Sequence, residues 1–312
     1  MTLDWATAHR MAMMAANQAH RDLGIARDEH VDVFAAMRSA GVCCLTEPLG
    51  NLAGAYAGAE LGGPVTLLNS RLDEITLRHT AGHELGHHRF GHALTADLGE
   101  ELDRGGLGGV WPDEEKLAEA FAAWFLMPLP AVRAAMRRAG FSRPASPIDV
   151  HQVACWLGTS FAGTARHLVN LKLASMRQYN DWTRSWNRHG PELRSSLAGL
   201  LPCDRVWVLG READQASMHV LPGDTLVFRS GHVRRPLPQG LRREAGAQPS
   251  LQSQDVITVT NELAGPVSVT VTIPGIPGGL AITLIPAPIR LGIDTAWTLQ
   301  PQHPGNGPGR GT

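Results

Sequence analysis

The sequence predicts an α+β protein that is mainly helical over its first 200 residues and all-β afterwards. Before about residue 200, alanine, leucine and arginine recur at a spacing of three to four residues, which is typical of amphipathic helices. After Cys203, short runs alternate β-branched residues with others, and proline and glycine separate these runs. At 312 residues the chain is about twice the common size of a domain, so we expect two domains.

The helical part is expected to contain a small sheet. The periodicity predicts helices at about residues 4–22, 30–40, 73–94, 113–126 and 129–139, with more between about 147 and 200. Strands are expected near Gly41–Leu45 and Pro64–Asn69, where apolar and β-branched residues follow a glycine or a proline.

The second part reads as a β-sandwich. Strands are expected in the segments RVWVL, TLVFR, DVITVT, VSVTVTI and AITLI. Asp255–Pro274 resembles a hairpin of an immunoglobulin-like sandwich, an architecture that hosts many functions. We therefore expect a helical domain at residues 1–200, a β-sandwich domain at 201–300, and a disordered tail at 301–312.

Composition shows that the chain as a whole is not a polycation. The chain has 28 Lys and Arg against 29 Asp and Glu, so its overall charge gives no field that would hold nucleic acid or an anionic membrane. The four cysteines lack the spacing of a zinc knuckle or a disulfide scaffold, which favours a reducing compartment. Because there is neither a signal-peptide pattern nor an apolar run of about 18 residues, we expect a soluble, cytoplasmic protein.

One segment carries the chemistry. His83-Glu84-Leu85-Gly86-His87 has the H-E-x-x-H pattern. On a helix, residues four apart differ by about 40° in azimuth and about 6 Å in rise, so both imidazoles can face one metal ion. Glu84 lies beside them, where its carboxylate can accept a proton from a metal-activated water.

A catalytic zinc usually takes a third protein ligand. A metzincin would have histidine six residues after His87, but that position is Ala93, and His92 lies one residue too early. The segment Asp113–Pro128 offers Glu115 and Glu119, one turn apart on one face of a predicted helix. Either carboxylate could complete the site.

The two segments together resemble the ImmA/IrrE metallo-endopeptidases. The family pattern has threonine, two small residues, H-E-x-G-H and, about 25 to 30 residues later, E-x-x-A-x-x-F-A-x-x-L-M-P. The matching residues are Thr80, His83–His87, Glu115, Ala118, Phe121, Ala122 and Leu126-Met127-Pro128. The resemblance covers about Val31–Leu173 and leaves the β-rich part without a counterpart.

The resemblance implies a zincin-like domain and a Zn²⁺ cofactor held by His83, His87 and Glu115. It further implies an endopeptidase in which Glu84 is the general base and a metal-activated water attacks the peptide bond. The substrate it implies is a protein such as a transcriptional repressor, cleaved in a stress, phage or mobile-element response. Because imidazole and carboxylate ligands accept several divalent ions, the residues alone do not select zinc.

Glu119 departs from the family pattern, which has asparagine at this position. Its carboxylate could be an acceptor behind the metal ligands or a rival ligand.

Two features of the reaction stay open at this point. The candidate donors to the developing oxyanion are His79, His88, His92, His151 and Tyr56. In zinc proteases that resemble this chain, a strand at the position of Pro64–Asn69 forms a sheet edge to which the substrate adds as a further strand. The alternative is a buried structural strand.

Two other functions compete with hydrolysis. Residues 147–172 have the outline of a helix-turn-helix, in which Arg166, His167 and Asn170 could reach base edges. DNA binding is possible but is not favoured, because the turn is otherwise apolar. The β-sandwich part could alternatively sense a ligand or bind a partner protein.

Overall fold

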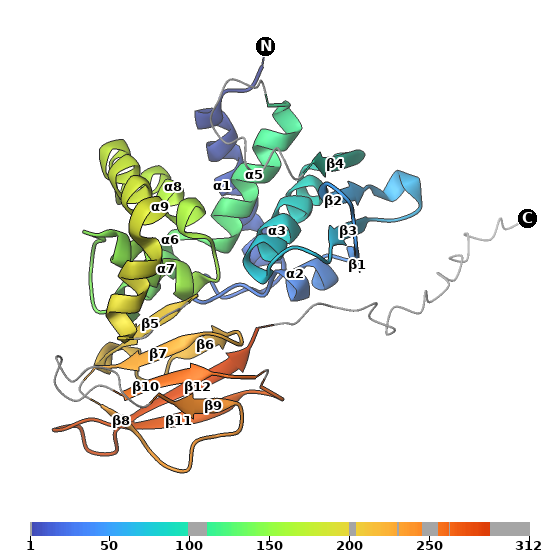
Figure 1. Ribbon diagram of the computed structural model, residues 1–312. Helices are drawn as coiled ribbons and strands as arrows, with labels where there is room; N and C mark the ends of the chain where they lie inside the picture. Colours follow the sequence, from blue (N-terminus) through green and yellow to red (C-terminus); the bar gives the residue numbers. More distant parts are fainter. Residues whose placement is uncertain are drawn as a thin grey trace, which may run out of the picture.

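The predicted α+β class is confirmed. The computed structural model describes residues 2–98, 111–199, 204–229, 231–244, 255–261 and 263–287. Within these ranges, eight α-helices all lie before residue 200, and eight of the twelve strands lie after it (Figure 1). The predicted tail at 301–312 lies outside the described residues.

The helices and strands of the first part agree with the predicted positions in most cases. The helices are α1 (Trp5–Asp22), α2 (Val33–Ser39), α3 (Glu74–Phe90), α5 (Asp113–Leu126), α6 (Leu129–Arg138), α7 (Pro147–Leu157), α8 (Phe161–Asn170) and α9 (Met176–Ala198). The strands are β1 (Cys43–Glu47), β2 (Leu52–Ala57), β3 (Val65–Asn69) and β4 (Leu94–Leu98). Strands β2 and β4 were not predicted.

The first sheet has the strand order β1-β3-β2-β4. Strand β3 pairs parallel with β1 and antiparallel with β2, so of the two alternatives for Pro64–Asn69, a sheet edge or a buried structural strand, the structure supports the buried strand. Among the described strands, β4 is an outer strand and pairs with β2.

Helix α3 is the central helix of this part. Asp73 begins it by accepting hydrogen bonds from the backbone N–H groups of Ile75 and Thr76. Gly91 ends it in the left-handed conformation, with φ +71°, so the predicted continuation to residue 94 is wrong. Helix α5 packs along one side of α3, and strands β2 and β3 lie on another (Figure 1).

Helices α3 and α5 approach closely at two glycines. A Cβ atom on Gly86 would lie 2.9 Å from the Cα of Ala118 and 3.2 Å from the Cβ of Phe121. A Cβ on Gly82 would lie 3.4 Å from the Cβ of Ala122. Since real Cβ atoms do not approach backbone atoms to 2.9 Å, the helices can pack at this distance only with glycine at position 86.

The second part contains two four-stranded sheets. Its strands are β5 (Val206–Leu209), β6 (Ser217–Val220), β7 (Thr225–Phe228), β8 (His232–Val233), β9 (Leu241–Arg243), β10 (Asp255–Val259), β11 (Val267–Thr272) and β12 (Leu280–Pro286). The five predicted strands are present as β5, β7, β10, β11 and β12.

The strand orders of these sheets are β5-β7-β10-β9 and β6-β12-β11-β8. The pairs β5–β7 and β6–β12 are parallel, whereas immunoglobulin sheets are built of antiparallel strands. An immunoglobulin-like sandwich is therefore not confirmed.

The two parts share polar contacts and a hydrophobic core. The buried Gln152 side chain of α7 donates to the carbonyl of Val206 and accepts from the N–H of Val208, so it satisfies backbone groups of strand β5. The His30 and His219 rings stack with their centroids 3.9 Å apart. Most of the buried apolar residues form one continuous cluster that extends across both parts.

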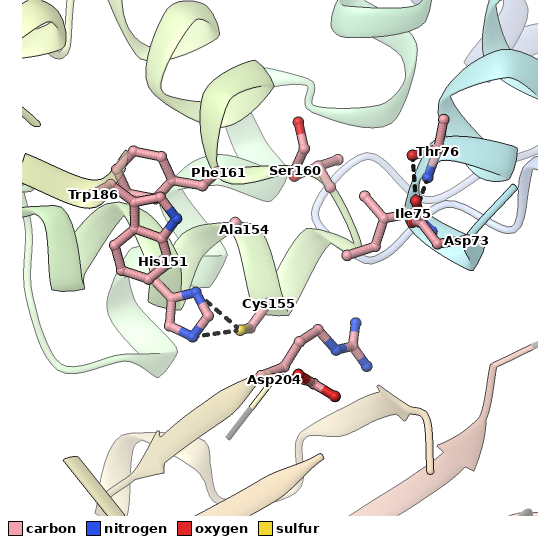
Figure 2. Close-up of a pocket in the computed structure, with 12 residues that line it drawn as sticks. Asp73, Ile75, Thr76, His151, Ala154, Cys155, Ser160, Phe161, Trp186 and Asp204 are labelled. Carbon is pink, nitrogen blue, oxygen red and sulfur yellow. Dashed lines mark hydrogen bonds between the residues drawn. The ribbon is translucent and has the colours of Figure 1, made fainter. Parts of the chain in front are cut away.

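A cavity of about 270 Å³ lies between the N-terminal end of α3, helices α7 to α9 and the start of β5. Figure 2 shows Phe161 and Trp186 on one side of it and Asp73 and Thr76 on the other. Burial raises the pKa of the Cys155 thiol to about 12, so this lining cysteine is not a ready nucleophile.

Among the described helices, none by itself has the length and apolar character needed to cross a membrane. Helices α5 and α6 reach the required length and apolar character only as a pair, and they are bent by 42° at their junction.

Replacing Gly86 by alanine tests the close packing of α3 and α5. We expect Gly86→Ala to lower the free energy of unfolding by about 1–3 kcal/mol, because the added methyl group overpacks the helix contact. Urea denaturation measures the change. Gly50→Ala is the matched control, since a Cβ at position 50 meets nothing within 4 Å. Equal stability of the two variants would show that the contact is not tight.

Candidate metal centre

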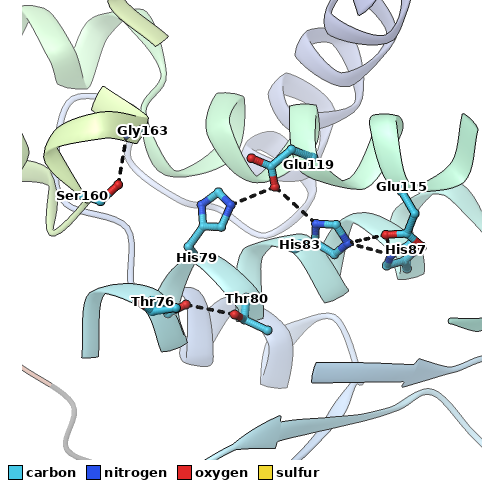
Figure 3. Close-up of polar contacts among 9 residues, drawn as sticks. All are labelled: Thr76, His79, Thr80, His83, His87, Glu115, Glu119, Ser160 and Gly163. Atoms are coloured by element: carbon cyan, nitrogen blue, oxygen red, sulfur yellow. Dashed lines mark hydrogen bonds and ion pairs between the residues drawn. The ribbon is translucent and has the colours of Figure 1, made fainter. Parts of the chain in front are cut away.

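Helix geometry aligns the polar side chains of this site. His79, His83 and His87 follow one another at four-residue spacing on α3, and Glu115 and Glu119 have the same spacing on α5. The two rows face each other where the helices pack (Figure 3). Both H-E-x-x-H histidines are almost fully buried, with 2% of His83 and 0% of His87 exposed.

Three possible metal-ligand atoms, from His83, His87 and Glu115, lie close to one another. His83 Nε2 lies 2.9 Å from His87 Nε2 and 3.0 Å from Glu115 Oε2, and the distance from His87 Nε2 to Glu115 Oε2 is 3.5 Å. Tetrahedral ligands ~2.0–2.1 Å from one zinc ion lie roughly 3.3 Å apart, so this set fits a single cation. His83, His87 and Glu115 form the group of possible ligands found among the described residues.

Glu115 is suited to hold a cation. Burial alone would raise its pKa, but hydrogen bonds and charge from His83 and His87 more than offset this effect and lower the pKa below its ordinary value. The carboxylate is therefore ionised at neutral pH.

Glu84 lies on the sheet side of α3. It is completely buried, and a Cβ on Gly54 of strand β2 would lie 2.5 Å from its Oε1 atom and 2.7 Å from Thr80 Cγ2. Glycine at position 54 thus leaves the space that the Glu84 carboxylate occupies. This role of Gly54 could not be predicted from the sequence, because it depends on the pairing of a strand that was not predicted.

The Nδ1 atoms of His83 and His87, which are not part of the converging set, each lie near another polar side chain. His92 Nδ1 lies 2.7 Å from His87 Nδ1, so one of these two nitrogens donates a hydrogen bond to the other. Glu119 Oε2 lies 2.9 Å from His79 Nε2 and 3.5 Å from His83 Nδ1 (Figure 3). Burial would raise the Glu119 pKa, but His79 and His83 lower it below its ordinary value.

The candidate oxyanion donors lie at different places in the structure. Tyr56 and His88 form a hydrogen bond, with 3.0 Å between the tyrosine hydroxyl oxygen and His88 Nδ1. His151 accepts a hydrogen bond from the Val206 backbone N–H at the junction with the β part, and burial lowers its pKa to about 3. His151 therefore stabilises that junction.

Comparison with known proteins agrees with this geometry. Residues 37–140 match the peptidase family described as the IrrE N-terminal-like domain. This part of the chain is similar to the ImmA/IrrE metallopeptidases. A search of the curated proteins finds no match to the chain. The matched residues contain β1 to β4, α3, α5 and α6, and the match supports a metallopeptidase with a metal cofactor.

The helix-turn-helix outline is present as α7 and α8, but it offers little to DNA. His167 is buried and its Nε2 bonds to the Met127 carbonyl, while Asn170 bonds to His9. Arg166 is exposed and lies over the Tyr179 ring. A recognition helix needs several side chains at its surface, and α8 does not present the predicted set.

Metal removal tests the site as a whole. A chelator should lower the unfolding temperature of the metal-loaded chain, because a metal present at 100 times its dissociation constant stabilises the fold by about 2.7 kcal/mol. Scanning calorimetry measures the shift. His83→Ala should show none, since it removes a nitrogen from the converging set. A parent protein that does not respond to the chelator would contradict a metal centre here.

Proposed function

We propose that the chain is a zinc-dependent endopeptidase in which His83, His87 and Glu115 bind the metal. The observation that carries the proposal is the convergence of two Nε2 atoms and one carboxylate oxygen, all within 4.8 Å of one another. When bound, a divalent cation at this position would polarise a scissile carbonyl and acidify a water molecule.

Glu84 is the general base in this proposal. Its carboxylate accepts the proton of the attacking water and returns it to the leaving amine. Glu84 is completely buried and its Oε1 atom lies against Gly54, which restricts the motion of the carboxylate before proton transfer.

We propose that the substrate is a protein segment bound in extended form. Strand β4 is an outer strand of its sheet among the described strands, and it begins four residues after the end of α3. An extended peptide can pair with such an edge through backbone hydrogen bonds, whatever its side chains. A transcriptional repressor is the substrate class suggested by similarity to the ImmA/IrrE family.

Replacing Glu84 by glutamine tests the general base. We expect Glu84→Gln to keep the metal and to lower kcat by roughly 100- to 10,000-fold, because the amide cannot accept the proton. Cleavage of a fluorogenic peptide library, together with metal analysis, measures both properties. If Glu84→Gln cleaves as fast as the parent protein, the assignment of the base is wrong.

Gly54→Ala tests the position of the base. The added methyl group would displace the Glu84 carboxylate, and a shift of about 1 Å can cost roughly 100-fold in rate. Both close atoms belong to side chains, so the fold should persist, unlike the backbone clash at Gly86. Peptide cleavage and urea denaturation of Gly54→Ala and of Gly50→Ala measure the two effects. Full activity of Gly54→Ala would contradict this role for glycine.

A further inference from the structure

Histidine and glutamate side chains alternate along the contact of α3 and α5. Glu119 lies between His79 and His83, at 2.9 Å from His79 Nε2 and 3.5 Å from His83 Nδ1. Glu115 lies between His83 and His87, at 3.0 Å and 3.5 Å from their Nε2 atoms. Figure 3 shows the two carboxylates on opposite sides of the His83 ring.

This arrangement distinguishes the two glutamates. The three converging atoms lie on the Nε2 side of His83, where Glu115 is. Glu119 faces Nδ1, the other nitrogen of the same ring, so it lies behind the ligand and not beside it. The geometry therefore separates two roles that the sequence left open.

An acceptor behind His83 has a definite physical effect. Neutral imidazole carries one N–H, so a ring that presents a lone pair at Nε2 carries its proton on Nδ1. A carboxylate facing that N–H selects this tautomer, fixes the ring orientation and makes Nε2 more basic. His79 Nε2, 2.9 Å from the same Glu119 oxygen, holds the carboxylate in place.

We propose that Glu119 is a positioning residue that orients His83 for metal binding, with His79 as its anchor. This inference rests on the proposed metal site. Glu119 does not contact the metal. Its charge acts through the His83 ring and raises the affinity of the centre for a divalent cation.

Zinc affinity of the full chain tests this inference. We expect Glu119→Gln, which keeps the shape of the side chain and removes its charge, to weaken Zn²⁺ binding by about 10- to 100-fold. Competition with a chromophoric chelator measures the affinity. Glu114→Gln is the matched control, because Glu114 is an exposed glutamate on the same helix. It should bind Zn²⁺ as the parent does.

Cobalt spectra and a second variant separate positioning from a general structural effect. The visible absorption of the Co²⁺-loaded chain should change in Glu119→Gln and not in Glu114→Gln, while the metal-free proteins unfold at the same temperature. His79→Gln should weaken Zn²⁺ binding in the same direction but less. This variant also serves as the test if Glu119→Gln does not fold.

The outcomes that would overturn the inference are distinct. Unchanged Zn²⁺ affinity and Co²⁺ spectrum in Glu119→Gln would show that the carboxylate does not act on His83. If Glu119→Gln loses Zn²⁺ as completely as His83→Ala while Glu115→Gln retains it, Glu119 is a ligand. If the parent chain binds no metal at His83 and His87, the proposed function fails together with this inference.

Discussion

The metal centre depends on how closely α3 and α5 pack. Gly86 lies next to His87 in the sequence, and Glu115 precedes Ala118 by one helical turn, so the point of closest approach lies beside the proposed ligands. Phe121 and Phe125 of α5 are fully buried, and their rings stack with centroids 5.3 Å apart. A wider separation of the helices would move the carboxylate away from both imidazoles. Glycine at position 86 thus permits the helix separation on which the proposed site depends.

Helix α3 also connects the site to the rest of the molecule. Its side facing the sheet carries Glu84, which fills the space left by Gly54. Near its start, the buried Arg78 donates hydrogen bonds to the carbonyls of Leu157 and Gly158 at the end of α7. These contacts satisfy carbonyl groups that the end of a helix leaves without intrahelical partners. The same helix therefore contacts α5, the sheet and, through α7, the part of the chain that packs on strand β5.

The helices and site residues that depend only on the pattern of neighbouring residues could be predicted from the sequence. The spacing of His83, Glu84 and His87 required only that α3 be a helix, and the span predicted for α5 agrees with the structure. Features that depend on strand pairing were not predictable. Leu52–Ala57 is rich in alanine and glycine and lacks β-branched residues, so β2 had no strand signal, and β4 was hidden by the assumed continuation of α3 past Gly91. Without these strands, the sequence could not decide whether β3 is an edge strand or an inner strand of the sheet. The roles of Glu115 and Glu119 could not be separated by spacing, because both lie on one face of α5. Only the orientation of the His83 ring distinguishes them.

We infer that one cation is held between α3 and α5 by two imidazoles and a single carboxylate. Anomalous diffraction at the zinc absorption edge, from crystals of the zinc-loaded chain, tests it most directly. We expect one strong peak bonded by His83 Nε2, His87 Nε2 and the Glu115 carboxylate. A peak held by Glu119 or His92 in place of Glu115, or no peak between these helices, would contradict it.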